Sequence, residues 1–249
     1  PGFEAAFAAI RHGQRAQFPE IQVPIYFSET DAQALDRREQ MAVDWVHRRI
    51  EPFVVSDEGL SLAEMVGRRL KAQTASLAVA ESCTGGLISS WITDVAGSSD
   101  YFRLGAVTYA NAAKEAILGV SAETLDRLGA VSRQTVMEMA AGARRRGDAT
   151  YGLATSGVAG PGGGSGQKPV GSLCIGIATA EGVGAAAYRF GANRRRANKV
   201  AFAAAALNLL RIVIDQGLTA DLEQRAKPIY AELLELDDGY HASGDEAPE

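Results

Sequence analysis

The chain has 249 residues, of which 47% are hydrophobic and 22% are charged, and its formal net charge is −5. This length and composition are typical of an ordinary soluble protein with one good-sized core and a smaller appendage. The sequence has no run of about eighteen apolar residues, and its first thirty residues lack the layout of a signal peptide, so we expect a cytoplasmic protein without a membrane partner.

Charge is unevenly distributed along the chain. Residues 60–214 carry 17 basic and 10 acidic residues, whereas the segment before them carries 6 against 10 and the segment after them 2 against 10. A positive middle segment suits a small phosphate-bearing molecule, and the acidic flanks argue against nucleic acid as a partner. An uneven solvated surface would give the same counts, so the charges alone do not identify a ligand.

The first 58 residues predict a small helix-strand-helix appendage, which we take as the first domain. Apolar residues have helical spacing from Phe3 to Gln14, alternate as in a strand from Ile21 to Phe27, and form an amphipathic pattern from Ala32 to Ile50. Pro52 and the polar segment 56–59 predict a linker after it.

Residues 60–215 alternate between helical and strand patterns and form the predicted main domain. A capping box at Ser61 and Glu64 predicts a helix to about residue 72. The strands predicted after it cover 77–80, 106–109, 151–155, 171–179 and 185–190, and the helices cover 85–95, 122–128, 135–146 and 196–214. Because this alternation has no regular repeat, it predicts an α/β fold, a layered α/β/α sandwich with a mixed sheet.

Residues 216–249 form a polar, acidic tail. The spacing of its apolar residues predicts one amphipathic helix over 219–236, and its last ten residues have the composition of a disordered end.

Cysteine and histidine are scarce in this sequence. Two cysteines are too few for a disulfide framework, and no cysteine–histidine spacing indicates a metal site, so we expect no metal and no cofactor. None of the three histidines lies between Leu60 and Asp215, which excludes a Ser-His-Asp triad in the main domain. A serine nucleophile there would need another base, and a lysine kept neutral by burial is the usual substitute.

Four short blocks gather hydroxyl groups, glycines and one lysine. They are Glu81-Ser82-Cys83-Thr84-Gly85-Gly86, Gly97-Ser98-Ser99, Tyr109 through Lys114, and Ser156-Gly157-Val158-Ala159-Gly160-Pro161. The first block joins a predicted strand to a predicted helix, so its backbone amides favour an anion, either phosphate or carboxylate. Simple capping of that helix by Ser82 and Thr84 is the alternative interpretation.

In order and spacing, these blocks resemble the C-terminal domain of the competence/damage-inducible protein CinA, whose stand-alone form is the bacterial nicotinamide mononucleotide deamidase. The resemblance covers residues 62–214 and also rests on Gly129-Ala130-Val131-Ser132 and Lys168-Pro169-Val170-Gly171. Several motifs at concordant spacing are far more specific than any single glycine motif. Residues 1–58 more weakly resemble part of the domain that precedes the amidase domain in full-length CinA proteins.

The resemblance implies metal-free hydrolysis of the carboxamide of nicotinamide mononucleotide to nicotinic acid mononucleotide and ammonia, a step of pyridine nucleotide salvage. It implies that Ser99 is the nucleophile, Lys114 the base and Tyr109 a member of the same hydrogen-bonded network. The substrate-binding residues would be Ser82, Thr84, Gly85, Ser156, Gly157 and Arg194. Arg194 is the best match to the family's phosphate-binding arginine, although Arg195 and Arg196 adjoin it. A homo-oligomer, a dimer or higher, is also expected.

Each assignment has an alternative. Cys83 beside a helix start is a competing nucleophile, because that position would lower the pKa of a thiol. Lys168 is a competing base, although it more simply closes the glycine-rich loop 160–166. The domain could also be a catalytically idle nucleotide-binding or regulatory module linked to competence or DNA damage response, or an amidase for another small amide.

Overall fold

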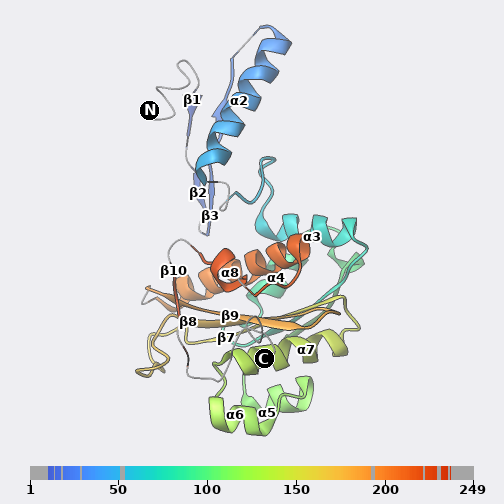
Figure 1. Cartoon of the computed structure of the whole chain (residues 1–249), viewed down its shortest axis with the longest axis vertical. Coiled ribbons are helices and arrows are strands. Elements are labelled where there is room, and N and C mark those ends of the chain that lie inside the picture. The colour runs from blue at the N-terminus through green and yellow to red at the C-terminus, as the bar shows by residue number, and fades with distance from the viewer. Residues whose placement is uncertain are drawn as a thin grey trace, which may run out of the picture. The chain divides into compact units, whose positions relative to one another are not determined.

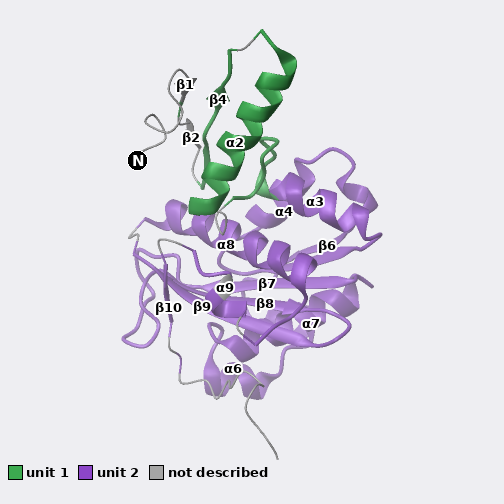
Figure 2. Ribbon diagram, turned by 45° about the horizontal axis from the view of Figure 1, so that its top comes forward, with its two compact units in different colours: residues 1–62 green, residues 63–249 purple. Residues whose placement is uncertain are grey.

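A computed structural model describes residues 11–13, 15–17, 19–28, 30–50, 54–191, 194–220, 222–228, 231–234 and 236. The chain divides into two compact units, Pro1–Leu62 and Ala63–Glu249, and each is described by itself (Figure 2).

The described residues of unit 1 form one long helix and four short strands. Helix α2 spans Ala32–Ile50, as predicted, and the Asp31 carboxylate at its start accepts hydrogen bonds from the backbone amides of Gln33 and Ala34. The strands pair antiparallel, β1 (Arg11–His12) with β4 (Ile25–Tyr26) and β2 (Arg15–Gln17) with β3 (Glu20–Gln22).

Two predictions for unit 1 need correction. The helix predicted over Phe3–Gln14 lies mostly outside the described residues, and where it is described, at residues 11–12, the chain is a strand. The strand predicted over Ile21–Phe27 is divided into β3 and β4 at Val23-Pro24, because a proline lacks the amide that a continuous ladder needs.

Unit 2 is built on a six-stranded mixed sheet in the order β10-β9-β8-β7-β5-β6. Its strands are β5 (Leu77–Glu81), β6 (Phe102–Val107), β7 (Tyr151–Gly157), β8 (Ser172–Ala178), β9 (Val183–Phe190) and β10 (Ala231–Leu233). The neighbours β6, β5 and β7 are parallel, and the pairs β7–β8, β8–β9 and β9–β10 are antiparallel. The predicted mixed sheet is therefore confirmed.

Helices cover both faces of this sheet, as predicted for a layered sandwich (Figure 1). One face carries α3 (Leu62–Ala72), α4 (Leu87–Thr93) and α8 (Arg195–Gln216). The other carries α5 (Asn111–Ala113), the π-helix η3 (Lys114–Leu118), α6 (Ala122–Leu128) and α7 (Arg133–Arg146). Helix α8 is long and apolar enough to cross a membrane, but most of it is buried in this sandwich, which is typical of a core helix.

Small residues on the sheet let α7 approach it closely. A Cβ atom at Gly152 would lie 2.1 Å from the Ala140 carbonyl oxygen, and one at Gly176 would lie 2.1 Å from that of Val136. The helix backbone therefore rests on the backbone of β7 and β8, where a larger residue would overpack the core and cost about 1–3 kcal/mol. Ala78, Ala80 and other buried residues complete this core.

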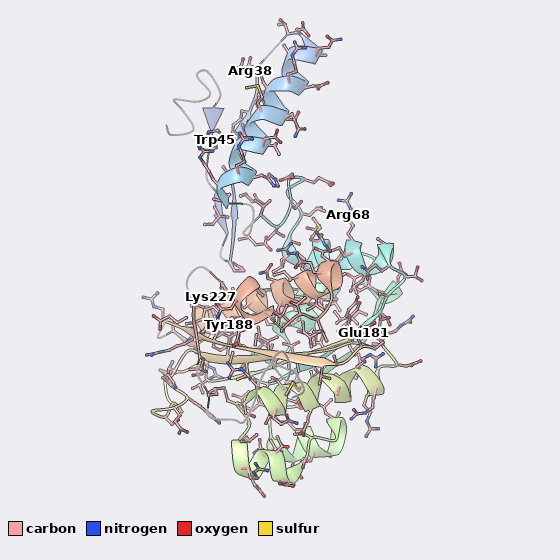
Figure 3. All side chains as sticks on the ribbon, in the orientation of Figure 1. Arg38, Trp45, Arg68, Glu181, Tyr188 and Lys227 are labelled. Atoms are coloured by element: carbon pink, nitrogen blue, oxygen red, sulfur yellow. The ribbon has the colours of Figure 1, made fainter. Side chains whose placement is uncertain are left out.

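The tail differs from its prediction. Instead of a helix over 219–236, it forms the four-residue helix α9 (Leu222–Arg225) and strand β10, which pairs with β9. The Glu223 carboxylate accepts hydrogen bonds from Arg133 Nη2 at 2.8 Å and from the Ala187 amide at 2.6 Å. Tyr188, labelled in Figure 3, donates its hydroxyl to the Glu223 carbonyl oxygen at 3.1 Å. The open edge of β9 and these bonds outweigh the helical pattern, and the predicted disordered end lies outside the described residues.

Candidate active site

Three hydroxyl residues follow the carboxyl ends of the three parallel strands or lie close to them. Ser82 follows β5, Thr108 follows β6, and Ser156 lies near the end of β7. The Ser82 amide donates to the Thr155 carbonyl oxygen and the Thr108 amide to that of Glu81, so the three ends stay in register. The carboxyl edge of parallel strands is where open α/β sheets bind ligands.

The three hydroxyls also share one face of the sheet. Side chains alternate along a strand, so each residue lies on the face of the residue two positions before it. Ala80 and Ala154 belong to the core cluster that packs against α7, which places Ser82 and Ser156 on the α7 side. Leu104 packs against the same cluster, and Thr108 is four positions further along. All three side chains therefore lie beside the segment 110–118 that follows β6.

Lys114 joins these hydroxyls at the start of η3. Its side chain is fully buried, and its Nζ atom lies 2.9 Å from the Thr108 carbonyl oxygen, 3.3 Å from that of Tyr109 and 3.5 Å from Ser82 Oγ. Burial lowers the pKa of the Lys114 ammonium below its ordinary value. A lysine in this environment can accept a proton more readily than a solvated one, which is what a general base requires.

The glycine-bearing turn that follows β5 is folded around a carboxylate of its own. Glu81 is fully buried, and its side chain accepts hydrogen bonds from the amides of Gly86, Ile88 and Ser89 and from the Ser89 hydroxyl, at 2.7–3.1 Å. The amides at the start of α4, which were predicted to bind an anion, thus bind the Glu81 carboxylate. Glu81, and not Ser82 or Thr84, caps this helix. The sequence could have indicated this cap, since an acidic residue directly precedes the turn.

Two further predicted residues of this turn, and Gly157 at the end of β7, have structural roles. The Thr84 hydroxyl is buried and lies 2.8 Å from the Thr155 hydroxyl. Gly85 has a φ of +62°, a left-handed conformation that favours glycine. A Cβ atom at Gly157 would lie 2.4 Å from the Ser172 carbonyl oxygen and 3.3 Å from Cys83 Sγ, so a glycine is required for this contact.

Cys83 does not have the environment of a nucleophile. Burial raises the pKa of its thiol to about 12, whereas the helix-start position had predicted a lowered value. Desolvation wins because the side chain is buried and the amides at the helix start already bind Glu81.

We therefore expect Cys83 to resist alkylation. At pH 8, iodoacetamide should label neither Cys83 nor the equally buried Cys174 in the native protein, and both should react once the chain is unfolded in guanidinium. Mass spectrometry of the digested protein measures this site by site. Rapid labelling of native Cys83 would return it to the list of candidate nucleophiles.

Ser99 and Lys114 lie at opposite ends of β6. Ser99 is exposed in the short 3-10 helix η2 (Ser98–Asp100), just before the strand begins, and Lys114 follows the strand's other end. Six residues of strand extend roughly 17 Å or more at about 3.3 Å per residue. The structure therefore does not bring Ser99 to Lys114 within one chain, and it brings Ser82 there instead. The reason is that β5 and β6 are parallel, so the residues that follow them, Ser82 and Lys114, lie at the same edge of the sheet.

Positive charges from α8 lie above the same edge. Tyr109 is exposed, and its hydroxyl oxygen accepts a hydrogen bond from Arg195 Nη2 at 2.9 Å. Arg195 Nη1 donates to the Gly160 carbonyl oxygen at 3.1 Å. Lys199 is one turn further along, and its Nζ atom lies 3.2 Å from where a Cβ of Gly85 would be. Arg194 is exposed and makes no side-chain cap at the start of α8. Sequence reasoning missed Lys199, whose signal was the spacing of four from Arg195.

Lys168, the competing base, has a different role. Its ammonium donates to the Leu128 carbonyl oxygen at the end of α6, and the amide of Lys168 donates to Ser165 Oγ within the glycine-rich loop. It therefore ties this loop to α6, while Lys114 is the lysine beside Ser82.

The site thus combines a buried lysine with a serine at the carboxyl edge of a mixed α/β/α sandwich. Residues 59–214 match the model of the CinA C-terminal domain, and the chain belongs to this family. The CinA-like protein of Desulfosudis oleivorans is 48% identical over 210 residues, which are 84% of this chain and 51% of that protein. The CinA-like protein of Desulforapulum autotrophicum is 49% identical over 209 residues, 82% of this chain and 48% of that protein. The chain thus spans about half the length of these two relatives.

Solved structures show the same fold. The competence/damage inducible protein CihA from Agrobacterium tumefaciens is 41% identical with a TM-score of 0.59, covering 63% of this chain and 98% of that one. A CinA superfamily protein from Klebsiella pneumoniae 700603 is 31% identical with a TM-score of 0.60, covering 62% and 96%.

Proposed function

We propose that this chain is a metal-independent amidase with Ser82 as the nucleophile and Lys114 as the general base. The observation that carries the proposal is the set of three contacts around Lys114 Nζ. A neutral amine has two N–H donors and one lone pair. When the two donors bind the carbonyl oxygens of Thr108 and Tyr109, the lone pair is left to face Ser82 Oγ at 3.5 Å, a distance that substrate binding can shorten.

The reaction follows from this arrangement. Ser82 Oγ attacks the carboxamide carbon while its proton passes to Lys114 Nζ, and the carbonyl electron pair moves onto the oxygen. The pair returns, the C–N bond breaks, and Lys114 gives its proton to the departing nitrogen, which leaves as ammonia. Water then attacks the acyl-serine ester and gives a proton to Lys114. That proton passes to Ser82 Oγ as the acyl–oxygen bond breaks, and the carboxylic acid formed loses its remaining proton to water or ammonia and leaves as the carboxylate.

The substrate we propose is nicotinamide mononucleotide, which would give nicotinic acid mononucleotide for pyridine nucleotide salvage. The resemblance to the CinA amidase domain supports this choice, together with the cations of α8 above the site. Arg195 and Lys199 carry two positive charges toward the turn 82–86 and Tyr109, which suits a phosphomonoester. In this proposal Arg195, which contacts Tyr109, binds the phosphate in place of Arg194. Ser156 and Gly157 form a wall of the site. A cytoplasmic homo-oligomer stays a prediction.

The test is ammonia release from nicotinamide mononucleotide by purified protein in the presence of a chelator. We expect turnover, and we expect nicotinamide riboside, which lacks the phosphate, to be hydrolysed at least about tenfold less efficiently in kcat/KM, a difference of about 1.4 kcal/mol. Binding of nicotinamide mononucleotide without ammonia release would contradict the proposal and indicate a nucleotide-binding module. Equal turnover of both compounds would contradict the role of the α8 cations.

A further inference from the structure

Thr108 holds a buried hydroxyl that has no internal partner. Its side chain is fully buried, and among the described residues its Oγ1 atom makes no hydrogen bond. The backbone of Thr108 is satisfied, because its amide donates to the Glu81 carbonyl oxygen at 2.9 Å and its carbonyl accepts from Lys114 Nζ at 2.9 Å. The unpaired group is therefore the hydroxyl alone.

Thr108 lies beside the reacting pair of the proposed site through its backbone. Lys114 Nζ is within 3.5 Å of both Ser82 Oγ and the Thr108 carbonyl oxygen, so the two residues flank one atom. Thr108 also follows Leu104 and Ala106 on the sheet face that carries Ser82 and Ser156. The Thr108 side chain is therefore on the side of the sheet where a group would bind at Ser82.

An unsatisfied buried hydroxyl destabilises the folded protein, and a valine would fill the same volume without that cost. Where such a hydroxyl lies next to a proposed site, a bound ligand can supply the missing partner. A buried and unpaired hydroxyl suits the stabilisation of a developing negative charge, since no internal bond must break first.

We propose that the Thr108 hydroxyl donates a hydrogen bond to the substrate's carboxamide oxygen as Ser82 attacks. The electron pair of the C=O bond moves onto that oxygen, Thr108 keeps its proton, and no bond to Thr108 breaks. The inference rests on the proposed function, and it adds a catalytic residue that neither the sequence motifs nor the resemblance assigned.

A matched control lies at the other end of β6. The Tyr101 hydroxyl is also buried without a hydrogen-bond partner among the described residues, but it packs against Gly67 of α3, beyond the amino end of the strand. Removing either hydroxyl should stabilise the fold. Only removal of the Thr108 hydroxyl should affect turnover.

The experiment compares Thr108→Val, Thr108→Ser and Tyr101→Phe with the wild type. We expect Thr108→Val to lower kcat about 10²–10³-fold with KM within about threefold, and to raise Tm by about 2 °C or more. Thr108→Ser should keep kcat within about tenfold, and Tyr101→Phe should raise Tm with kcat unchanged. A Thr108→Val enzyme with wild-type kcat overturns the inference and leaves the amidase intact. A wild type that releases no ammonia overturns the amidase itself, and this inference with it.

Discussion

Ser82→Ala is expected to lower ammonia release from nicotinamide mononucleotide by about 10³-fold or more, whereas Ser99→Ala should stay within about threefold of the wild type. The reason is geometric, because Lys114 Nζ lies 3.5 Å from Ser82 Oγ, while Ser99 is exposed beyond the opposite end of β6. A nucleophile without an adjacent base reacts slowly at neutral pH. Steady-state assays of the three proteins, with Tm measured for each, decide between the two serines.

An inactive Ser99→Ala variant would call for a mixing experiment between two variants. If Ser99→Ala is inactive and folded, the assignment of Ser82 within one chain is contradicted, and a second copy remains as the source of Ser99. Ser99→Ala and Lys114→Arg would then be mixed under conditions that allow subunits to exchange. Recovery of activity in the mixture would show that the two residues come from different chains, and continued inactivity would leave no support for their pairing.

The fold was largely predictable because local signals and tertiary packing agree over residues 62–214. The helix predicted at 122–128 is α6 to the residue, because Gly129 ends it with a positive φ. The prediction for the tail was wrong because its local pattern and its tertiary pairing disagree. Its helical spacing is a local signal, but helix α9 ends at Arg225, Pro228 disfavours a continued helix, and residues 231–233 pair with the edge of β9 instead. An edge that becomes free only when the sheet assembles cannot be detected in the tail's own sequence.

Several residues expected in the site lie together, and their roles in catalysis stay predictions. Ser82, Lys114, Tyr109 and Ser156 were all expected in it, and their motifs do meet at one sheet edge. The choice of Ser99 as nucleophile and Lys114 as base came from the resemblance to the CinA domain, and the motifs that carry it do not say which end of a strand a residue occupies. For Cys83, the sequence indicated a helix start but not the burial that outweighs it.

The second large effect concerns the protonation of Lys114. We expect kcat/KM to rise with pH through the pKa of Lys114 and then to level off, because only the neutral amine can accept the Ser82 proton. Burial lowers this pKa, so the rise should lie below the ordinary lysine value of 10.5. Lys114→Arg, which keeps the charge but stays protonated, should lose about 10³-fold or more at every pH tested. A Lys114→Arg enzyme with wild-type turnover would exclude Lys114 as the base.

The same lowered pKa has a consequence for folding that needs no substrate. Between the folded-state pKa of Lys114 and 10.5, the unfolded chain binds more protons than the folded one, so the free energy of unfolding should rise with pH across this window. Below the folded-state pKa both states are protonated, and the cost of burying the ammonium is fully present. Guanidinium unfolding at a series of pH values measures the slope, which Lys114→Met should lose and the exposed-site variant Lys227→Met should keep. An unchanged slope in Lys114→Met would mean that Lys114 titrates like a solvated lysine, and the chemical argument for it as the base would fail with it.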